Sequence, residues 1–383
     1  MTTLASNRNH ANQGIWFLLQ VSNDFVSRRF CNWKAGRHPT YRHDNVKFEN
    51  SNLIGDKKRA KRARQRLRSK GMCGQKRGDW SWLKQCCGLT GWGDKKDKRV
   101  CWLCKAQKAD LRDASLNARW RHTVNFNPDW FLEQLLVGGF ISSIFLIPGF
   151  LAKYFSIDVM HCVCLGILQI FEGNLLYEIF LEMGGTPYMK KPNDIMTPLN
   201  ALLCSAAKAI GHDMPVYFIT LRMLKPEKAS KGPTAKLKAA ESRRLLPICV
   251  ALLEMYFPPQ DARERLRLNA AKMLNSFYVE MKNWDADASP FKLGSILRSY
   301  TALYVELGDA TLAQWPDMTY WPWKLIPKNH IILHAVEIQV AQYGNPKLSW
   351  CYMDESAMGR CIELAESVHV SYIHRAVINK YRL

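Results

Sequence analysis

Apolar residues recur at helical spacing between residues 162 and 183, in the stretch CVCLGILQIFEGNLLYEIFLEM. Positions three and four apart fall on one face of an α-helix, so this spacing predicts a long and largely buried helix. The same criterion predicts further helices over residues 195–211, 235–256, 260–283 and 290–308. The centre and the second half of the chain should therefore be mainly α-helical.

Proline and glycine residues divide these helices. Pro247 should kink or break the helix that contains it, because proline removes a backbone donor and clashes with the preceding turn. Gly232 with Pro233, and the proline-rich stretch 315–327, should form connections between helices. A last helix should begin near Asp354.

A separate apolar run, residues 134–152, is uncharged and just long enough to cross a membrane. Glu133 and Lys153 flank this run, and a Gly-Gly pair and a Pro-Gly pair interrupt it. Short apolar runs punctuated in this way more often form buried strands and turns. We therefore favour a buried segment over a membrane span.

The charge balance narrows the choice of partner. The chain has 383 residues and a formal net charge of +21, from 54 Lys and Arg against 33 Asp and Glu. Its length allows two domains or one elaborated domain. An excess of positive charge this large favours a polyanionic partner, with DNA or another nucleic acid first and an anionic membrane second. We expect no small-molecule substrate, and an oligomer is compatible with the sequence.

Much of this charge is concentrated in residues 57–70, KKRAKRARQRLRSK, which contain nine Lys or Arg and no acid. A helix charged on nearly every face cannot pack into a core. Two interpretations remain open: a solvated linker, or a nucleic-acid contact or nuclear localisation signal. In the second interpretation the residues that contact nucleic acid are Lys57, Lys58, Arg59, Lys61, Arg62, Arg64, Arg66 and Arg68.

These features divide the chain into three parts. Residues 1–71 should be a basic, partly disordered N-terminal region, residues 72–125 a Trp- and Cys-rich segment, and residues 126–383 a mostly helical remainder. No apolar run follows the opening Met-Thr-Thr-Leu, so we expect no secretory signal. The 12 cysteines should then be reduced, in a protein of the nucleus or cytoplasm that is not secreted.

Cys101 and Cys104 have the C-x-x-C spacing that places two thiolates on one Zn²⁺. One such pair is half of a tetrahedral site, which here would be a zinc knuckle. We favour His122 as a further ligand, and the alternatives are Cys73, Cys86 and Cys87. Buried, reduced cysteines without a metal are the competing interpretation. A redox motif is less favoured, because no strand and helix flank the pair.

Asp158 and His161 form a D-x-x-H element directly before the helix predicted for residues 162–183. Taken alone, Ser156 or Asp158 would cap that helix and His161 would lie in its first turn. The flanking residues KYFSI and CVCLGIL are largely apolar, so both polar groups should enter the protein interior. There they would need hydrogen-bond partners or a metal.

Three other sets of polar residues have weaker patterns. His330 and His334 lie four apart, hence on one helical face, but no H-E-x-x-H order is present and we expect hydrogen-bonded core histidines. Asp79, alone in RGDWSW, is typical of a turn or a helix cap. Glu355 follows the apolar segment WCYM and should lie where a buried segment becomes an acidic helix.

Set in order, these motifs resemble those of CACTA-type DNA transposases. The segment DWSWLKQCCGLTGWGDKKDKRVCWLC is similar to that family's D-F-P-A, leucine, S-G-W and C-P-x-C pattern through Asp79, Leu89, Gly91, Trp92, Cys101 and Cys104. IDVMHCVCLGIL is similar to its D-P-M-H-x-x-x-L-G-I motif through Asp158, Met160, His161, Leu165, Gly166 and Ile167. ESAMGRC is faintly similar to its E-D-F-x-G motif through Glu355 and Gly359. Order and spacing agree over residues 77–170 and again near 350–360.

The resemblance implies an α/β fold, mainly helical by content, with an RNase H-like core interrupted by a large helical insertion. It also implies phosphodiester cleavage and strand transfer on DNA, in which carboxylates hold two Mg²⁺ or Mn²⁺ ions. In that arrangement Asp79 would be the second acidic ligand and Glu355 the last. Asp158 and His161 would support the catalytic site from beside it.

One family motif has no counterpart in this chain. The first acid of these transposases lies in a D-G-F motif upstream of the cysteines, and no D-G-F occurs here. Two carboxylates rarely hold two metal ions, so the sequence leaves open whether a transposase-derived protein has kept its activity or only its DNA binding. The alternatives are a non-catalytic, zinc-containing scaffold that binds nucleic acid, and a membrane-associated basic protein.

Overall fold

The computed structural model describes residues 80–89, 98–125, 154–224, 226 and 231–352, together with positions 356, 360, 363 and 367. These residues belong to two compact units. The first contributes helix α4 (Trp80–Cys87), and the second consists of Leu89–Gly138 and Ser156–Cys351. The second unit therefore contains Cys101 and Cys104 together with most of the helical remainder. The sequence analysis instead places a boundary between these two parts, after residue 125.

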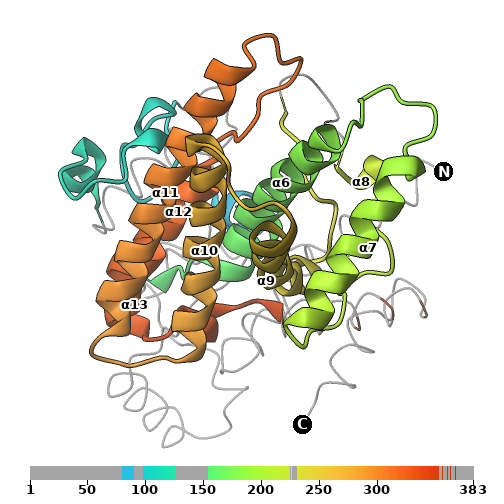
Figure 1. Cartoon of the computed structure of the whole chain (residues 1–383). Coiled ribbons are helices and arrows are strands. Elements are labelled where there is room, and N and C mark those ends of the chain that lie inside the picture. Colours follow the sequence, from blue (N-terminus) through green and yellow to red (C-terminus); the bar gives the residue numbers. More distant parts are fainter. Residues whose placement is uncertain are drawn as a thin grey trace, which may run out of the picture. The chain divides into compact units, whose positions relative to one another are not determined.

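The second unit is an assembly of helices (Figure 1). Its long helices are α6 (Gln169–Glu182), α7 (Asn193–Ala209), α9 (Ala239–Tyr256), α10 (Ala262–Lys282) and α11 (Ser289–Gln314). Its short elements are η3 (Ala109–Arg112), η4 (Arg119–Thr123), η7 (Met160–Leu168), α8 (Leu221–Leu224), α12 (Pro327–His334), η8 (Ala335–Gln339), α13 (Val340–Tyr343) and η9 (Pro346–Ser349). Helices α10 and α11 pack along one another, and η7 continues directly into α6.

The helices predicted from apolar spacing are confirmed. The predicted helix 162–183 corresponds to η7 and α6 together, and the other four correspond to α7, α9, α10 and α11. Helix α9 runs through Pro247 without ending, so the break considered at that proline does not occur. Leu246 and Ile248 on either side of the proline are fully buried, and this packing offsets the missing backbone hydrogen bond.

The connections also agree with the sequence. Gly232 and Pro233 lie in an extended segment, and no helix is present between α11 and α12. The last helix, predicted to begin near Asp354, lies mostly outside the described residues.

The described residues form no β-strand, and an isolated antiparallel bridge pairs Arg99 with Gln107. The mainly helical content predicted from the apolar spacing is therefore confirmed. The sheet of an RNase H-like core is not among these residues. Only the coarser part of the predicted fold class is thus established.

The longest apolar helix, Met160–Glu182, has the length and hydropathy of a membrane span. However, 83% of its most apolar 18-residue window is buried inside the protein, and buried polar side chains on it contact other helices. It packs as a core helix of the second unit. The run 134–152, which the sequence offered as a span, lies outside the described residues.

Two buried polar side chains of α6 attach neighbouring segments to this core helix. Glu172 accepts a hydrogen bond of 2.6 Å from the hydroxyl of Ser242 on α9. Asn174 donates to the Pro233 carbonyl at 3.1 Å and accepts from the Trp323 backbone amide at 2.9 Å. A buried polar group is costly unless it is hydrogen-bonded. These contacts therefore specify where α9 and the segments at Pro233 and Trp323 pack against α6.

A third polar residue of α6, Glu178, lies at the centre of a buried ionic cluster. Its carboxylate accepts from Arg263 at 2.8 Å, from Arg267 at 3.4 Å and from the Trp323 indole at 2.6 Å. Arg267 also binds Glu182 at 2.7 Å. Burial raises the pKa of Glu178 and the two arginines oppose that rise, so the ionised state of the carboxylate depends on both of them.

Replacing Glu178 should test whether this cluster holds α10 against α6. Glu178→Ala removes the more deeply buried of the two carboxylates that bind both arginines, and we expect a loss of about 3–5 kcal/mol in the free energy of unfolding. The matched control is Glu254→Ala, which breaks the exposed Lys272–Glu254 pair of 2.7 Å between α10 and α9 and should cost less than about 1 kcal/mol. Equal losses for the two variants in chemical denaturation would contradict the assignment.

Candidate metal centre

Four side chains that can bind a metal converge inside the second unit: Cys101, Cys104, His330 and His334, here called the metal centre. Their ligand atoms all lie within 4.8 Å of one another. All four residues are buried, with exposed fractions of 0 to 2%. The cysteines and histidines lie more than 220 residues apart in the sequence, since Cys104 and His330 are separated by 226 positions.

The spacing of these atoms is close to that of a tetrahedral site. The Cys104 sulfur lies 3.1 Å from His330 Nε2, which lies 3.1 Å from His334 Nε2. A tetrahedron with Zn–N of ~2.1 Å and Zn–S of ~2.3 Å has edges of roughly 3.3–3.8 Å, so a small expansion would admit the ion. Two sulfur and two nitrogen donors suit Zn²⁺. With four protein ligands the site is closed, which is typical of a structural ion.

The protonation states of the group favour metal binding. A hydrogen bond with Cys101, together with contacts to His330 and His334, lowers the pKa of Cys104 to about 2 against the effect of burial. Burial lowers the pKa of His334 and so keeps its imidazole neutral, and it raises the pKa of the Cys101 thiol. The directions of these shifts favour a Cys104 thiolate and a neutral His334, which are the states in which these side chains bind a metal.

Backbone amides of the C-x-x-C turn point at both sulfurs. The Leu103 amide donates to Cys101 Sγ at 3.2 Å and the Ala106 amide donates to Cys104 Sγ at 3.4 Å. Hydrogen bonds to a thiolate stabilise its negative charge. We call residues 98–125, which carry this turn, the knuckle loop. Its own backbone contacts include Val100 to Ala106 at 2.9 Å.

The histidines come from α12, whose start is specified locally. Pro327 occupies the first turn, where a missing amide costs nothing, and Asn329 Oδ1 accepts from the Ile326 amide at 3.0 Å. His330 and His334, four apart on this helix, therefore present both rings on one face. The π-helical segment η8 begins directly after His334.

The imidazole rings are packed by the knuckle loop itself. The Trp120 ring stands edge to face with His330 at 4.5 Å and with His334 at 5.1 Å. The neighbouring Arg121 forms an ion pair with Glu337, whose carboxylate also binds Arg298 of α11 at 2.6 Å. Such contacts around a site orient its ligands. Besides the four ligands, these ring contacts and ion pairs join the knuckle loop to α12, η8 and α11.

The structure differs from the sequence prediction in the second half of the ligand set. Cys101 and Cys104 belong to a group able to bind a metal, as predicted. His122 does not: its side chain is exposed and it is not a member of the metal centre. The histidines are His330 and His334, which the sequence pattern favoured as core residues. The sequence does contain a signal for the full ligand set, because the C-x-x-C pair and the H-x-x-x-H pair each supply two of the four ligands of a tetrahedral site.

Several candidate residues lie outside the described part of the chain. These are Asp79, Glu355, Cys73, and the basic residues Lys57, Lys58, Arg59, Lys61, Arg62, Arg64, Arg66 and Arg68. The side chain of Cys86 is likewise not described. Cys87 is described and buried, and it is not a member of the metal centre.

Asp158 is both a helix cap and a link to a distant segment. Its carboxylate accepts from the Met160 amide at 2.9 Å and the His161 amide at 3.3 Å, and it contacts the Nδ1 atom of His161. It also accepts from the Cys351 amide at 3.2 Å. Asp158 is 3% exposed, so these donors replace water around a buried carboxylate. Both interpretations of D-x-x-H, cap and interior polar element, are therefore correct.

The L-G-I part of the same motif contacts the helix that carries the histidines. Leu165 has non-helical dihedral angles within η7, and its carbonyl accepts from Lys328 Nζ at 2.7 Å. A Cβ atom at Gly166 would lie 2.2 Å from Cδ of Lys328, so a larger residue there would require the lysine side chain to move. Lys328 lies two residues before His330, and η7 is thereby fixed to the start of α12.

Comparison of the chain with family models, curated proteins and solved structures finds no match. Its function is therefore inferred from its own residues and their geometry.

The metal centre predicts zinc stoichiometry. The full chain should carry about one Zn²⁺, measured by elemental analysis, and Cys104→Ser or His334→Ala should reduce this to near zero. Acidification should release the ion, because protons compete for thiolates and imidazoles. The control is His122→Ala, which should keep its zinc. Loss of zinc in that variant, or retention in Cys104→Ser, would contradict the ligand set.

Asp158 offers a second prediction. Asp158→Ala removes the acceptor shared by three backbone amides, and we expect a loss of about 2–4 kcal/mol in the free energy of unfolding. Asp158→Asn keeps one carbonyl oxygen and should lose less than half as much. A change below about 0.5 kcal/mol for Asp158→Ala in urea denaturation would contradict this prediction, because the hydrogen bonds to Asp158 would then contribute little to the stability of the protein.

Proposed function

We propose that this chain is a DNA-binding protein derived from a CACTA-type transposase. In this proposal an RNase H-like core carries Asp79 and Glu355, and the metal centre holds one structural Zn²⁺. Since no strand lies within the described residues, the sheet of that core would have to come from the remaining residues. DNA is the partner, and the nucleus or cytoplasm is the compartment.

The contact between Asp158 and Cys351 is the observation that carries the proposal. It joins the D-x-x-H element to a backbone amide four residues before Glu355, although the two lie 193 positions apart. The resemblance requires such a neighbourhood, because D-x-x-H in these transposases supports the catalytic acids. Asp158 already accepts from three backbone amides and contacts His161, so it acts here as a positioning residue.

The chemistry in this proposal belongs to the carboxylates. Two Mg²⁺ or Mn²⁺ ions, when bound, activate the attacking oxygen and stabilise the leaving oxygen in phosphodiester transfer. Asp79 and Glu355 would hold these ions with a further acid. The contribution of Asp158 is to fix the chain just before Glu355. The zinc ion would take no part in the reaction, since the metal centre has no open position.

A second function is favoured by the closed metal centre and the absence of a D-G-F motif. The chain would then be a non-catalytic, zinc-containing scaffold that binds nucleic acid. A buried structural ion and a net charge of +21 are sufficient for that role. Both functions include DNA binding, and they differ only in whether Asp79 and Glu355 hold catalytic metal ions.

Strand cleavage separates the two functions. On labelled duplex DNA with Mg²⁺, the transposase-derived function predicts cleavage that Asp79→Ala and Glu355→Ala each abolish. Glu363→Ala, which removes an exposed acid eight residues beyond Glu355, should leave the rate unchanged. Binding without cleavage by the wild-type chain would favour the scaffold. Cleavage that survives both catalytic substitutions would contradict the assignment of Asp79 and Glu355.

A further inference from the structure

Positive charge is distributed unevenly within the second unit. The knuckle loop, residues 98–125, contains seven Lys or Arg against two Asp, whereas residues 245–350 contain ten of each sign. Residues 245–350, which include α10 and α11, are thus neutral in total, while the loop folded around the metal centre is strongly basic. A concentrated excess of one sign attracts a partner of the opposite sign.

Both acids of the knuckle loop are used within the loop. Asp110 Oδ2 accepts from the Gln107 amide at 2.7 Å, and Asp113 Oδ1 accepts from the Ser115 amide at 3.0 Å. These are local turn and capping contacts of the kind that Asp side chains often make. They stabilise the backbone of the loop and leave its lysines without a neutralising acid from the loop itself.

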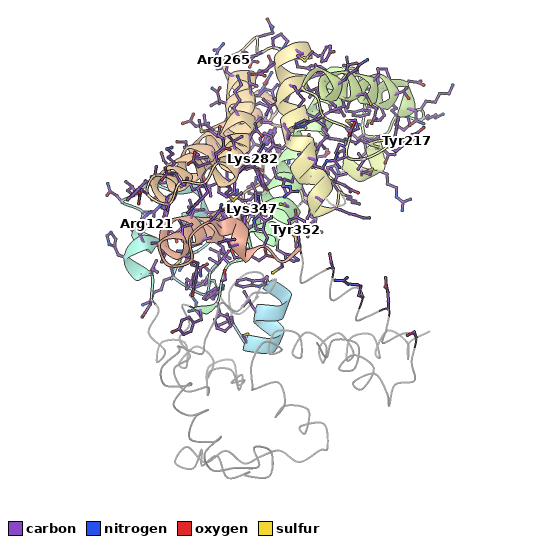
Figure 2. All side chains as sticks on the ribbon, turned by 90° about the horizontal axis from the view of Figure 1, so that it is seen from below. Arg121, Tyr217, Arg265, Lys282, Lys347 and Tyr352 are labelled. Carbon is purple, nitrogen blue, oxygen red and sulfur yellow. The ribbon has the colours of Figure 1, made fainter. Side chains whose placement is uncertain are left out.

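Two arginines of the loop are used to attach it to the helices. Arg112 binds Asp309 of α11 at 2.5 Å, and Arg121 forms an ion pair with Glu337 and lies over the Trp120 ring at 4.4 Å. Figure 2 labels Arg121, which comes from this loop. Both of these cations therefore already have a carboxylate partner on the helical part of the second unit.

Of the five remaining Lys and Arg of the loop, Arg99 is half-buried and the other four are exposed, as is the neighbouring His122. We call Lys98, Lys105, Lys108, Arg119 and His122 the basic face. Among the described residues, no acid forms a salt bridge with its three lysines or with Arg119. Exposed charges are usual on a protein surface, but an excess of one sign on a single loop attracts a partner of the opposite sign.

The geometry of the loop holds this face outward. In the 3₁₀-helix η4, residues three apart eclipse one another, so Arg119 and His122 point the same way. Between them Trp120 is 3% exposed and packs on the ring of His330. The buried tryptophan thus turns Arg119 and His122 toward solvent.

Two further backbone contacts bring the lysines close to other parts of the loop. The Lys105 amide donates to Thr123 Oγ1 at 2.9 Å, which places Lys105 beside the residue that follows His122. The bridge between Arg99 and Gln107 brings together their neighbours, Lys98 and Lys108. All of these positions lie on the loop that carries Cys101 and Cys104, so an ion bound at the metal centre would help to hold their arrangement.

We propose that the basic face of the knuckle loop is a second DNA contact, which binds the phosphate backbone in addition to the run at residues 57–70. The inference rests on the proposed DNA binding and adds the surface of the folded unit that performs it. Lysine and arginine side chains on an exposed loop suit phosphate oxygens rather than base edges. The contact would therefore position the duplex without reading its sequence.

The test compares two sets of four substitutions in the full, zinc-loaded chain. The first set is Lys98→Ala, Lys105→Ala, Lys108→Ala and Arg119→Ala. The matched set removes four exposed cations from the region of α8 and α9, with Arg222→Ala, Lys236→Ala, Lys238→Ala and Arg244→Ala. The residues of the run 57–70 stay intact in both. Zinc content and the thermal midpoint of each protein show that the second unit is still folded.

Affinity for a labelled duplex of arbitrary sequence is measured at several salt concentrations. For the first set we expect an affinity at least about 10-fold weaker. The slope of log K against log salt should also become shallower, by about 0.9 for each phosphate that the protein no longer neutralises. The matched set should stay within about 3-fold of wild type. A first set that binds like wild type, or two sets that weaken binding equally, would overturn the inference.

Two outcomes separate this inference from its foundation. If the wild-type chain fails to bind duplex DNA at low salt, the proposed function itself fails. If the wild-type chain binds DNA and the four loop substitutions leave its affinity unchanged, DNA binding stands and the basic face is excluded as a DNA contact. Anionic phospholipid vesicles form a third arm: tighter binding to vesicles than to DNA, abolished in the first set, would assign the face to a membrane and overturn the DNA contact.

Discussion

Two short motifs that are 226 residues apart in the chain meet in the second unit, where their four side chains could share one metal ion. Residues 98–125 have only 3₁₀ turns and one isolated bridge, so regular hydrogen bonding cannot hold them in shape. Burying two cysteines and two histidines without a shared ion would leave polar groups poorly satisfied in the interior. A metal ion would satisfy all four at once, and the loop, α12 and the π-helical segment after it would then form one body.

The polar residues of the core act on the same principle over longer distances. Glu178 and Asn174 on α6 attach α10 and the segment around Trp323, while Asp158 attaches the backbone at Cys351. The two π-helical segments of the described residues also begin beside buried polar side chains. Segment η7 begins two residues after Asp158, and η8 begins directly after His334. Such irregular turns are often found at functional sites, because they re-aim side chains that a regular helix would place differently.

The metal centre and the proposed catalytic acids have different tasks. A closed site of two sulfurs and two nitrogens gives the knuckle loop its shape and offers no position to a substrate. Phosphodiester transfer needs oxygen ligands and open coordination positions, which Asp79 and Glu355 would supply in the proposed function. The basic face lies on the loop that the metal centre organises, so zinc binding would influence DNA affinity without entering the chemistry.

The sequence by itself determined the helices and one half of the metal centre. Apolar spacing located α6, α7, α9, α10 and α11, because burial of a helical face is encoded by residues three and four apart. The spacing of Cys101 and Cys104 identified a metal ligand pair for the same local reason. Only the tertiary structure decided that His330 and His334, and not His122, complete the group, because ligands from separate segments meet through packing that no local pattern records. Packing also decided that α9 continues through Pro247, since buried neighbours outweigh the cost of one proline.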